Sequence, residues 1–203
     1  MRHLWKKYLT YAFLACGLFA FAACSDDDDA PEPENEGETI TDVTLIFTNL
    51  SDPTDVVRAS AKDPDGAGIR EIEVLDAITL RPESLYALNM EILDASNPND
   101  IEDIAEEIEE EDDEHQFFFA FTNNAFSIPT GGGNIDGNSE IVYNDFDANG
   151  NPLGLSTLWT TAGTLNAGFF RVRLQHQPDI KSSTTTANDG DIDVDLTFTL
   201  NIR

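Results

Sequence analysis

The residues of this chain best suited to chemistry are His115 and His176, which are the only histidines after the first 24 residues. Glu111 precedes His115 by four positions in an acidic segment with helical periodicity, so these two side chains would share one face of a helix. Zinc and copper accept neutral imidazoles and carboxylates as ligands. The sequence therefore predicts His115, His176 and Glu111 as candidate ligands of a divalent metal.

Two structural interpretations compete with this metal site. In the first, His115 ends the helix, where its charge suits the helix dipole, and His176 continues the apolar face of a strand at 170–174. In the second, Arg171 and Arg173, on the opposite face of that strand, form an ion network with the acidic segment. Both interpretations require no metal.

A second candidate cation site lies in the segment 145–156. Asp145, Asp147 and Asn149 place oxygen ligands at alternating positions, and Gly150 permits a tight bend, as in the first half of a calcium-binding loop. The twelfth position is Ser156 and not the bidentate Glu of such loops. Because Asn-Gly is also a hairpin-turn dipeptide, the pattern favours a turn over a calcium site.

Common catalytic motifs are missing from the sequence. There is neither a G-x-S-x-G nucleophile elbow nor an H-E-x-x-H motif, and both cysteines, Cys16 and Cys24, lie near the N-terminus. Paired carboxylates carry little information in a chain with 39 acids. We therefore predict a binding protein and not an enzyme.

An acidic segment at 97–115 is expected to form the one helix and to position the candidate ligands. Asn97 followed by Pro98 is a suitable helix start, with a capping side chain before proline. Six acids at 109–114 crowd the other end, where the dipole is already negative, so a positive group should contact them. One apolar stripe would face the core, formed by Ile101, Ile104, Ala105 and Ile108.

The remainder of the folded chain has the two-residue periodicity of β-strands. The clearest run, at 191–202, alternates strictly between apolar residues, starting with Ile192, and Asp, Thr or Asn. The segment 116–121 is apolar on both faces, which is typical of a central strand. Further strands are expected at 43–47, 55–61, 69–78, 86–92, 141–145, 155–161 and 170–174.

Eight or nine short strands with one helix predict an antiparallel β-sandwich of the immunoglobulin or fibronectin III type, with the acidic helix inserted. Leu80, Pro82 and Tyr86 add a local indication. Their spacing resembles the loop and tyrosine that precede a late strand in fibronectin III domains.

The first 39 residues have the features of an export and anchoring segment. Basic residues precede an apolar run, and FAAC at 21–24 resembles the bacterial lipobox, in which the cysteine becomes diacylated. SDDDD at 25–29 resembles the signal that sends lipoproteins of Bacteroidota to the outer face of the outer membrane. We therefore expect a signal peptide at 1–23, a disordered tether at 24–39 lipidated on Cys24, and one β-sandwich domain at 40–203.

The chain is strongly acidic. Removal of residues 1–23 takes away three of the 11 basic residues and none of the 39 acids, which leaves a formal net charge of 8 minus 39, or −31. Such a charge repels nucleic acid and raises the local concentration of cations. A nucleic-acid partner is therefore not expected.

Several motifs together resemble a family of small, acidic, surface-exported lipoproteins of flavobacteria. They are SDDDD at 25–29, DPDG at 63–66, EEIEEEDDEHQFFF at 106–119, DFDANGNPLGL at 145–155 and LQHQPDIK at 174–181. Members often carry the label of a type 1 periplasmic-binding-fold protein, which implies two α/β lobes, whereas the strand-rich pattern here predicts a sandwich. The resemblance implies no established activity, but its motifs include Glu111, His115 and His176.

These observations predict a lipoprotein on the outer membrane, facing outward, that captures zinc or copper, with calcium less favoured. Its expected partner is a TonB-dependent receptor or another envelope protein. The alternative is a structural, adhesion, glycan-binding or complex-assembly module in which the acidic helix is the docking face. Removal of both histidines would abolish ligand binding in the first case and change little in the second.

Overall fold

The computed structural model describes residues 38–63 and 72–203, which belong to one compact unit, Asn35–Arg203. The expected signal peptide, the lipidation site Cys24, nearly all of the tether and most of the DPDG motif lie outside the described residues. Within the described part of the chain, no helix has the length and apolar character needed to span a membrane.

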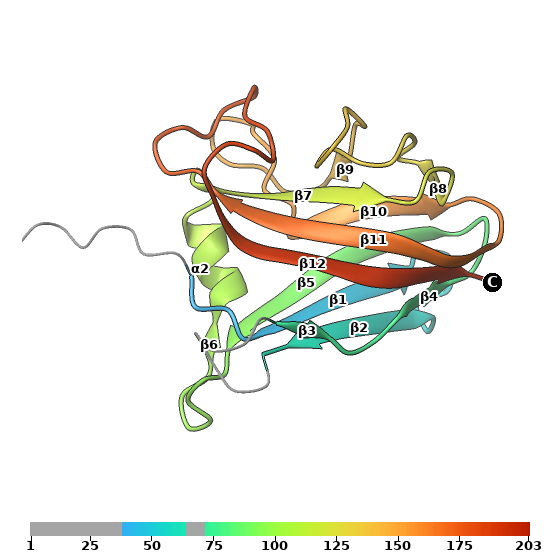
Figure 1. Ribbon diagram of the computed structural model, residues 1–203, viewed down its shortest axis with the longest axis horizontal. Helices are drawn as coiled ribbons and strands as arrows, with labels where there is room; N and C mark the ends of the chain where they lie inside the picture. The colour runs from blue at the N-terminus through green and yellow to red at the C-terminus, as the bar shows by residue number, and fades with distance from the viewer. Residues whose placement is uncertain (1–37, 64–71) are drawn as a thin grey trace, which may run out of the picture. The chain divides into compact units, whose positions relative to one another are not determined.

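Two β-sheets pack face to face, and one short helix, α2, lies at the end of the sandwich away from the C-terminus (Figure 1). The first sheet has the order β3-β2-β1-β5-β10-β8, with β6 beside β5 and β9 beside β10. It contains β1 (Asp42–Asn49), β2 (Val56–Lys62), β3 (Glu73–Val74), β5 (Leu85–Asp94), β6 (Glu102–Asp103), β8 (Phe126–Ile128), β9 (Val142–Tyr143) and β10 (Ser156–Thr161).

The second sheet has the order β4-β12-β11-β7. It contains β4 (Ile78–Leu80), β7 (His115–Phe121), β11 (Leu165–His176) and β12 (Asp191–Ile202). Neighbouring strands run antiparallel except β4 and β12, which are parallel. The predicted antiparallel β-sandwich with one acidic helix is confirmed, but the single strand expected at 69–78 is divided between β3 and β4, in different sheets.

The core between the sheets is built by alternate residues of each strand, as the two-residue periodicity requires. Trp159 on β10 lies at its centre, with its ring centroid 4.9 Å from those of Phe126 and Phe170. Aromatic pairs in edge or tilted contact add stability beyond the area that they bury. Packing of this kind gives a rigid frame for the strand ends.

Tyr86 makes the contacts expected of a tyrosine at the start of a late strand. Its hydroxyl accepts a hydrogen bond from the Arg81 backbone N–H, at 3.0 Å, and donates one to the Asp55 carboxylate, at 2.8 Å. A return bond from a tyrosine to the backbone just upstream is a feature of immunoglobulin-like sandwiches. The arrangement is compatible with that type of sandwich.

Strand β7 is buried on both faces as predicted, but it is an edge strand and not a central one. The loop between β8 and β10 covers its free edge: the Phe117 N–H donates to Leu153 O at 2.7 Å and the Phe121 N–H donates to Gly132 O at 2.9 Å. An uncovered edge would leave such groups unpaired. A small second core forms on its outer face from Phe118, Ala120, Ile135 and Ala187.

Helix α2 (Ile104–Glu110) begins six residues later than the sequence predicts. Asn97 closes a turn instead, in which its carbonyl accepts from the Asp100 N–H, and the capping carboxylate is that of Asp103, which accepts from the Ala105 N–H. The preceding residues pair as β6 with β5. This ladder outweighs the helical pattern, so Ile101 lies outside the helix and is 57% exposed.

Candidate metal centre

His115 and His176 lie side by side although 60 positions separate them in the chain. His115 is the first residue of β7 and His176 the last of β11, and the register of this antiparallel pair places them opposite one another. Their rings are stacked, with centroids 4.7 Å apart and planes inclined by 10°. Both histidines are buried. The structure thus brings together the two histidines that the sequence singled out.

A third side chain, Asp193, reaches this pair because of an irregularity in β12. Val194 pairs with Leu174, but Ile192 pairs with Gln175, so Asp193 is an extra residue in β12, a β-bulge. A bulge turns side chains toward the other face of the sheet. The Asp193 side chain is consequently only 5% exposed, whereas Ile192, expected in the core, is 53% exposed.

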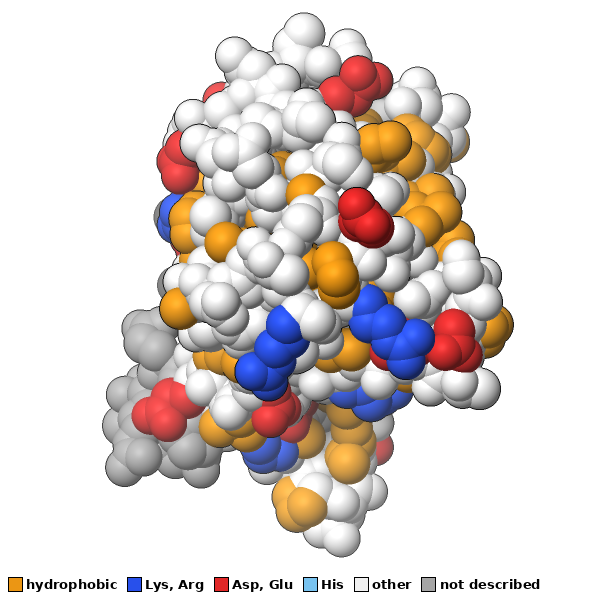
Figure 2. Space-filling model, turned by 90° about the vertical axis from the view of Figure 1, so that its right-hand side faces the viewer, with side chains coloured by type: hydrophobic (Ala, Val, Ile, Leu, Met, Phe, Trp, Pro, Cys, Tyr) orange, Lys and Arg blue, Asp and Glu red, His pale blue; other side chains and the backbone are white. Residues whose placement is uncertain are grey.

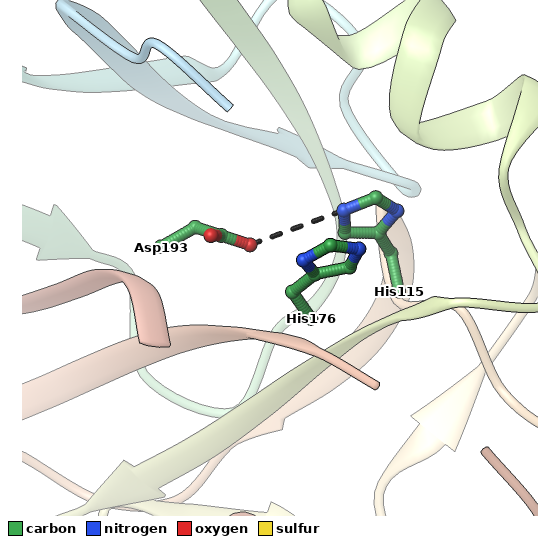
Figure 3. Close-up of side chains that lie close together, drawn as sticks. All are labelled: His115, His176 and Asp193. Atoms are coloured by element: carbon green, nitrogen blue, oxygen red, sulfur yellow. Dashed lines mark ion pairs between the residues drawn. The ribbon is translucent and has the colours of Figure 1, made fainter. Parts of the chain in front are cut away.

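The inner cluster, as we call His115, His176 and Asp193, has donor atoms that all lie within 4.8 Å of one another. Figure 3 shows the Asp193 carboxylate directed toward the two rings. Its Oδ2 lies 3.9 Å from His115 Nε2, and neither atom has a hydrogen-bond partner among the described residues. Two ligands of a tetrahedral zinc ion lie about 3.3 Å apart, given bonds of about 2.0 Å. A movement of a few tenths of an ångström would therefore allow both atoms to bind one ion.

The protonation of His115 leaves its Nε2 ready to act as a ligand. His115 Nδ1 lies 3.3 Å from the Glu111 backbone carbonyl. Because a carbonyl can only accept, the ring hydrogen is placed on Nδ1 and the lone pair on Nε2. That lone pair faces a carboxylate oxygen, which is also an acceptor. A cation between these two acceptors would satisfy both of them.

Burial controls the charges of the inner cluster. It lowers the pKa of His115 to about 4, with a further decrease from the neighbouring His176. Burial also raises the pKa of Asp193 to about 6. At neutral pH the His115 imidazole is therefore neutral and the Asp193 carboxylate largely ionised, which are the forms that bind a metal.

Glu111, the third predicted ligand, lies near His115 but on the other edge of its ring. Its Oε2 is 3.9 Å from His115 Nδ1, and it belongs with Glu38 to a second group of donors within 4.8 Å, here named the outer pair. Burial, and then the charge of Glu107, raise the pKa of Glu38 to about 7. The inner cluster thus contains Asp193 in the place expected for Glu111.

Lys181 is the positive group that contacts the acidic segment. Its side chain is buried, and its ammonium group donates to the Asp112 backbone carbonyl and lies 3.7 Å from the Asp147 carboxylate. Arg171 and Arg173, proposed for this role from the sequence, instead contact Asp195 on the neighbouring strand, at 2.6 Å and 2.8 Å.

The segment resembling a calcium loop is a turn that uses its own carboxylates. Asp147 accepts from the backbone N–H groups of Asn149 and Asn151, both at 2.8 Å. Asp145 accepts from the N–H groups of Gly154 and Ser156, both at 2.9 Å. The two carboxylates therefore act as backbone acceptors in a closed loop, and they do not appear together in a donor cluster of the described residues.

Sequence reasoning missed Asp193 and Glu38, and also Glu114, whose carboxylate lies 3.4 Å from His176 Nε2. Glu114 is one of six adjacent acids, and nothing in their order distinguishes it. Glu38 is the last acid before the first strand, a position that gives a weak signal. No signal in the sequence pointed to Asp193, because strict alternation along β12 assigns its side chain to the solvent face.

No protein-family model, curated protein or solved structure matches this chain. Its class is therefore defined by the fold and the site alone. It is an acidic β-sandwich protein with a buried cluster of two histidines and one aspartate at the end of the sandwich that carries α2.

Proposed function

We propose that this protein captures a divalent transition metal, zinc or copper, in the inner cluster. The observation that carries the proposal is the pair His115 Nε2 and Asp193 Oδ2, two buried acceptors that face one another at 3.9 Å and have no hydrogen-bond partner in the described part of the chain. Burial of such groups is costly unless a partner compensates it. A divalent cation would satisfy both atoms at once.

The donor set supports zinc or copper over calcium. Imidazole nitrogens suit zinc and copper, whereas calcium takes six to eight oxygen ligands. Two histidines and one carboxylate leave at least one coordination position for water or for a ligand from a partner, as in zinc sites that are not purely structural. This property suits a protein that takes up an ion and passes it on.

The lipobox-like FAAC and the acidic SDDDD segment support a location on the outer membrane, anchored through Cys24 and facing outward. The partner that we propose is an envelope protein such as a TonB-dependent receptor. The charge of −31 after the expected cleavage would raise the concentration of cations near the domain.

The test is calorimetric titration of zinc chloride and copper sulfate into residues 25–203. This segment contains the compact unit with its core and omits the expected lipidation site. We expect saturable binding of one ion, which the double change His115→Gln and His176→Gln abolishes. The control is Glu106→Gln with Glu110→Gln, which removes two exposed acids of α2.

Weak, salt-sensitive binding that the histidine changes leave intact would contradict the proposal. It would mean that 39 acids attract cations without a defined site. The acidic helix as a docking face for a protein would then be the better explanation.

A further inference from the structure

The outer pair, Glu38 and Glu111, lies between solvent and the inner cluster. Both residues are half-buried, whereas His115, which is the member shared by the two donor groups, is fully buried. The outer pair is near the Nδ1 edge of the imidazole and Asp193 near the Nε2 edge. The width of one ring therefore separates a partly exposed donor group from a buried one.

We propose that Glu38 and Glu111 form a loading position, which holds the incoming cation before it moves past the edge of the His115 ring into the inner cluster. This inference rests on the proposed function of the inner cluster. It assigns the outer pair a role in the rate of capture and not in the final coordination of the ion.

The hydrogen bonding of His115 argues against a second permanent ion at the outer pair. His115 Nδ1 lies 3.3 Å from the Glu111 carbonyl, which holds its hydrogen, so this nitrogen has no lone pair for a metal. Carboxylates alone would remain, and they bind zinc less strongly than imidazole does. An ion would therefore stop there briefly and then reach the neutral Nε2.

The surroundings of the outer pair favour attraction of a cation. Glu107, one turn before Glu111, is close enough to interact with Glu38, and Glu111 Oε2 is buried without a hydrogen-bond partner among the described residues. Figure 2 views the opposite end of the sandwich, on which several Lys and Arg side chains lie. Clustered charge of one sign at an entrance raises association rates.

The test compares, at pH 8, where Glu38 is mostly ionised, two variants of residues 25–203 that each lose two carboxylates. One is Glu38→Gln with Glu111→Gln, and the other is Glu106→Gln with Glu110→Gln on the exposed face of α2. Stopped-flow mixing with zinc and a fluorescent zinc indicator gives the association rate constant. A chase with excess EDTA gives the dissociation rate constant.

We expect the outer-pair variant to bind zinc about tenfold more slowly than the wild type, within the range known for electrostatic steering. The helix variant should slow association less than twofold. Dissociation from the outer-pair variant should not become faster, because the inner ligands are intact. By contrast, Asp193→Asn should speed dissociation.

Equal association rates in the two variants would overturn the loading position. Faster dissociation from the outer-pair variant would overturn it too, since Glu38 and Glu111 would then be ligands of the bound ion. Absence of zinc binding by the wild type is a different outcome, which rejects the function of the inner cluster itself. The two failures are thus distinguishable.

Discussion

At the scale of single residues, Asp193 is the group whose burial is hardest to explain without a ligand. Its carboxylate is almost entirely enclosed beside a neutral imidazole and has an oxygen without a hydrogen-bond partner among the described residues. A stabilising role would require donors, and His115 Nε2, which lies 3.9 Å away, is an acceptor in the tautomer that the Glu111 carbonyl holds. The metal-free protein should therefore be more stable without this charge.

The change Asp193→Asn tests this cost through its pH dependence. The pKa of Asp193 is about 6 in the fold and ordinarily 3.8, so the folded state holds a proton that the unfolded state has lost. The contribution of this bound proton to the free energy of unfolding is fully present below pH 3.8 and is lost as the pH rises through 6. We expect the variant to gain about 2 kcal/mol relative to the wild type between pH 4 and pH 7.5.

Urea unfolding in EDTA at both pH values measures this difference. The comparison of variant with wild type at each pH isolates Asp193 from the other titrating groups. A constant difference between the two proteins across this range would show that the carboxylate is not destabilised by the fold.

At the scale of elements, Lys181 connects the turn that precedes His115 to the hairpin loop that follows His176. Its own backbone N–H donates to Gln177 O, and the Gln177 N–H donates to Glu114 O at 2.6 Å. With the bond from Lys181 to the Asp112 carbonyl, these contacts fix the ends of β7 and β11 on which the two histidines stand. Lys181 thus affects the site by fixing the ends of β7 and β11, which carry His115 and His176.

We expect Lys181→Met to lower the free energy of unfolding by about 2 kcal/mol, because it leaves buried acceptors without their donor. Lys62 provides the matched control: its ion pair with Asp42 is 2.7 Å long but its side chain is 52% exposed. Exposed pairs contribute at most about 1 kcal/mol, so Lys62→Met should have a small effect. Urea unfolding at pH 7 compares the two, and equal losses would contradict the role given to Lys181.

Much of the arrangement of elements could be predicted from the sequence, because alternation records directly which face of a strand is buried. The strands at 43–47 and 86–92 were identified in this way, whereas the two histidines stood out because they are the only ones after the first 24 residues. What could not be predicted depends on partners distant in the chain. The free edge of β7 is hidden by a loop that follows it, and the bulge at Asp193 exists only relative to the register of β11. The late start of α2 likewise results from pairing with β5.

At the scale of the whole molecule, the proposed ion would bind the folded state alone. Strands β7, β11 and β12 bring the inner cluster together, and the unfolded chain has no such site. At a free concentration 100 times the dissociation constant, a ligand of this kind adds about 2.7 kcal/mol. For a domain of this size, that corresponds to an increase in melting temperature of roughly 5 to 10 °C.

Thermal unfolding of residues 25–203 with zinc, and then with zinc and excess EDTA, measures this increase. The wild type should return to its metal-free melting temperature after chelation. His115→Gln with His176→Gln should show neither change. An equal increase in both proteins would indicate that cations act through the general negative charge.

The bulge in β12 has a consequence for how such a protein can change over generations. Because Asp193 is one extra residue in a ladder that is otherwise regular from Val194 to Leu200, a deletion of a single codon would leave that part of the ladder and the core intact. Ile192 would stay opposite Gln175 and Asp191 opposite His176, because the extra residue takes no part in these pairs. A lineage could therefore gain or lose the acid of the inner cluster in one mutational step while keeping the sandwich.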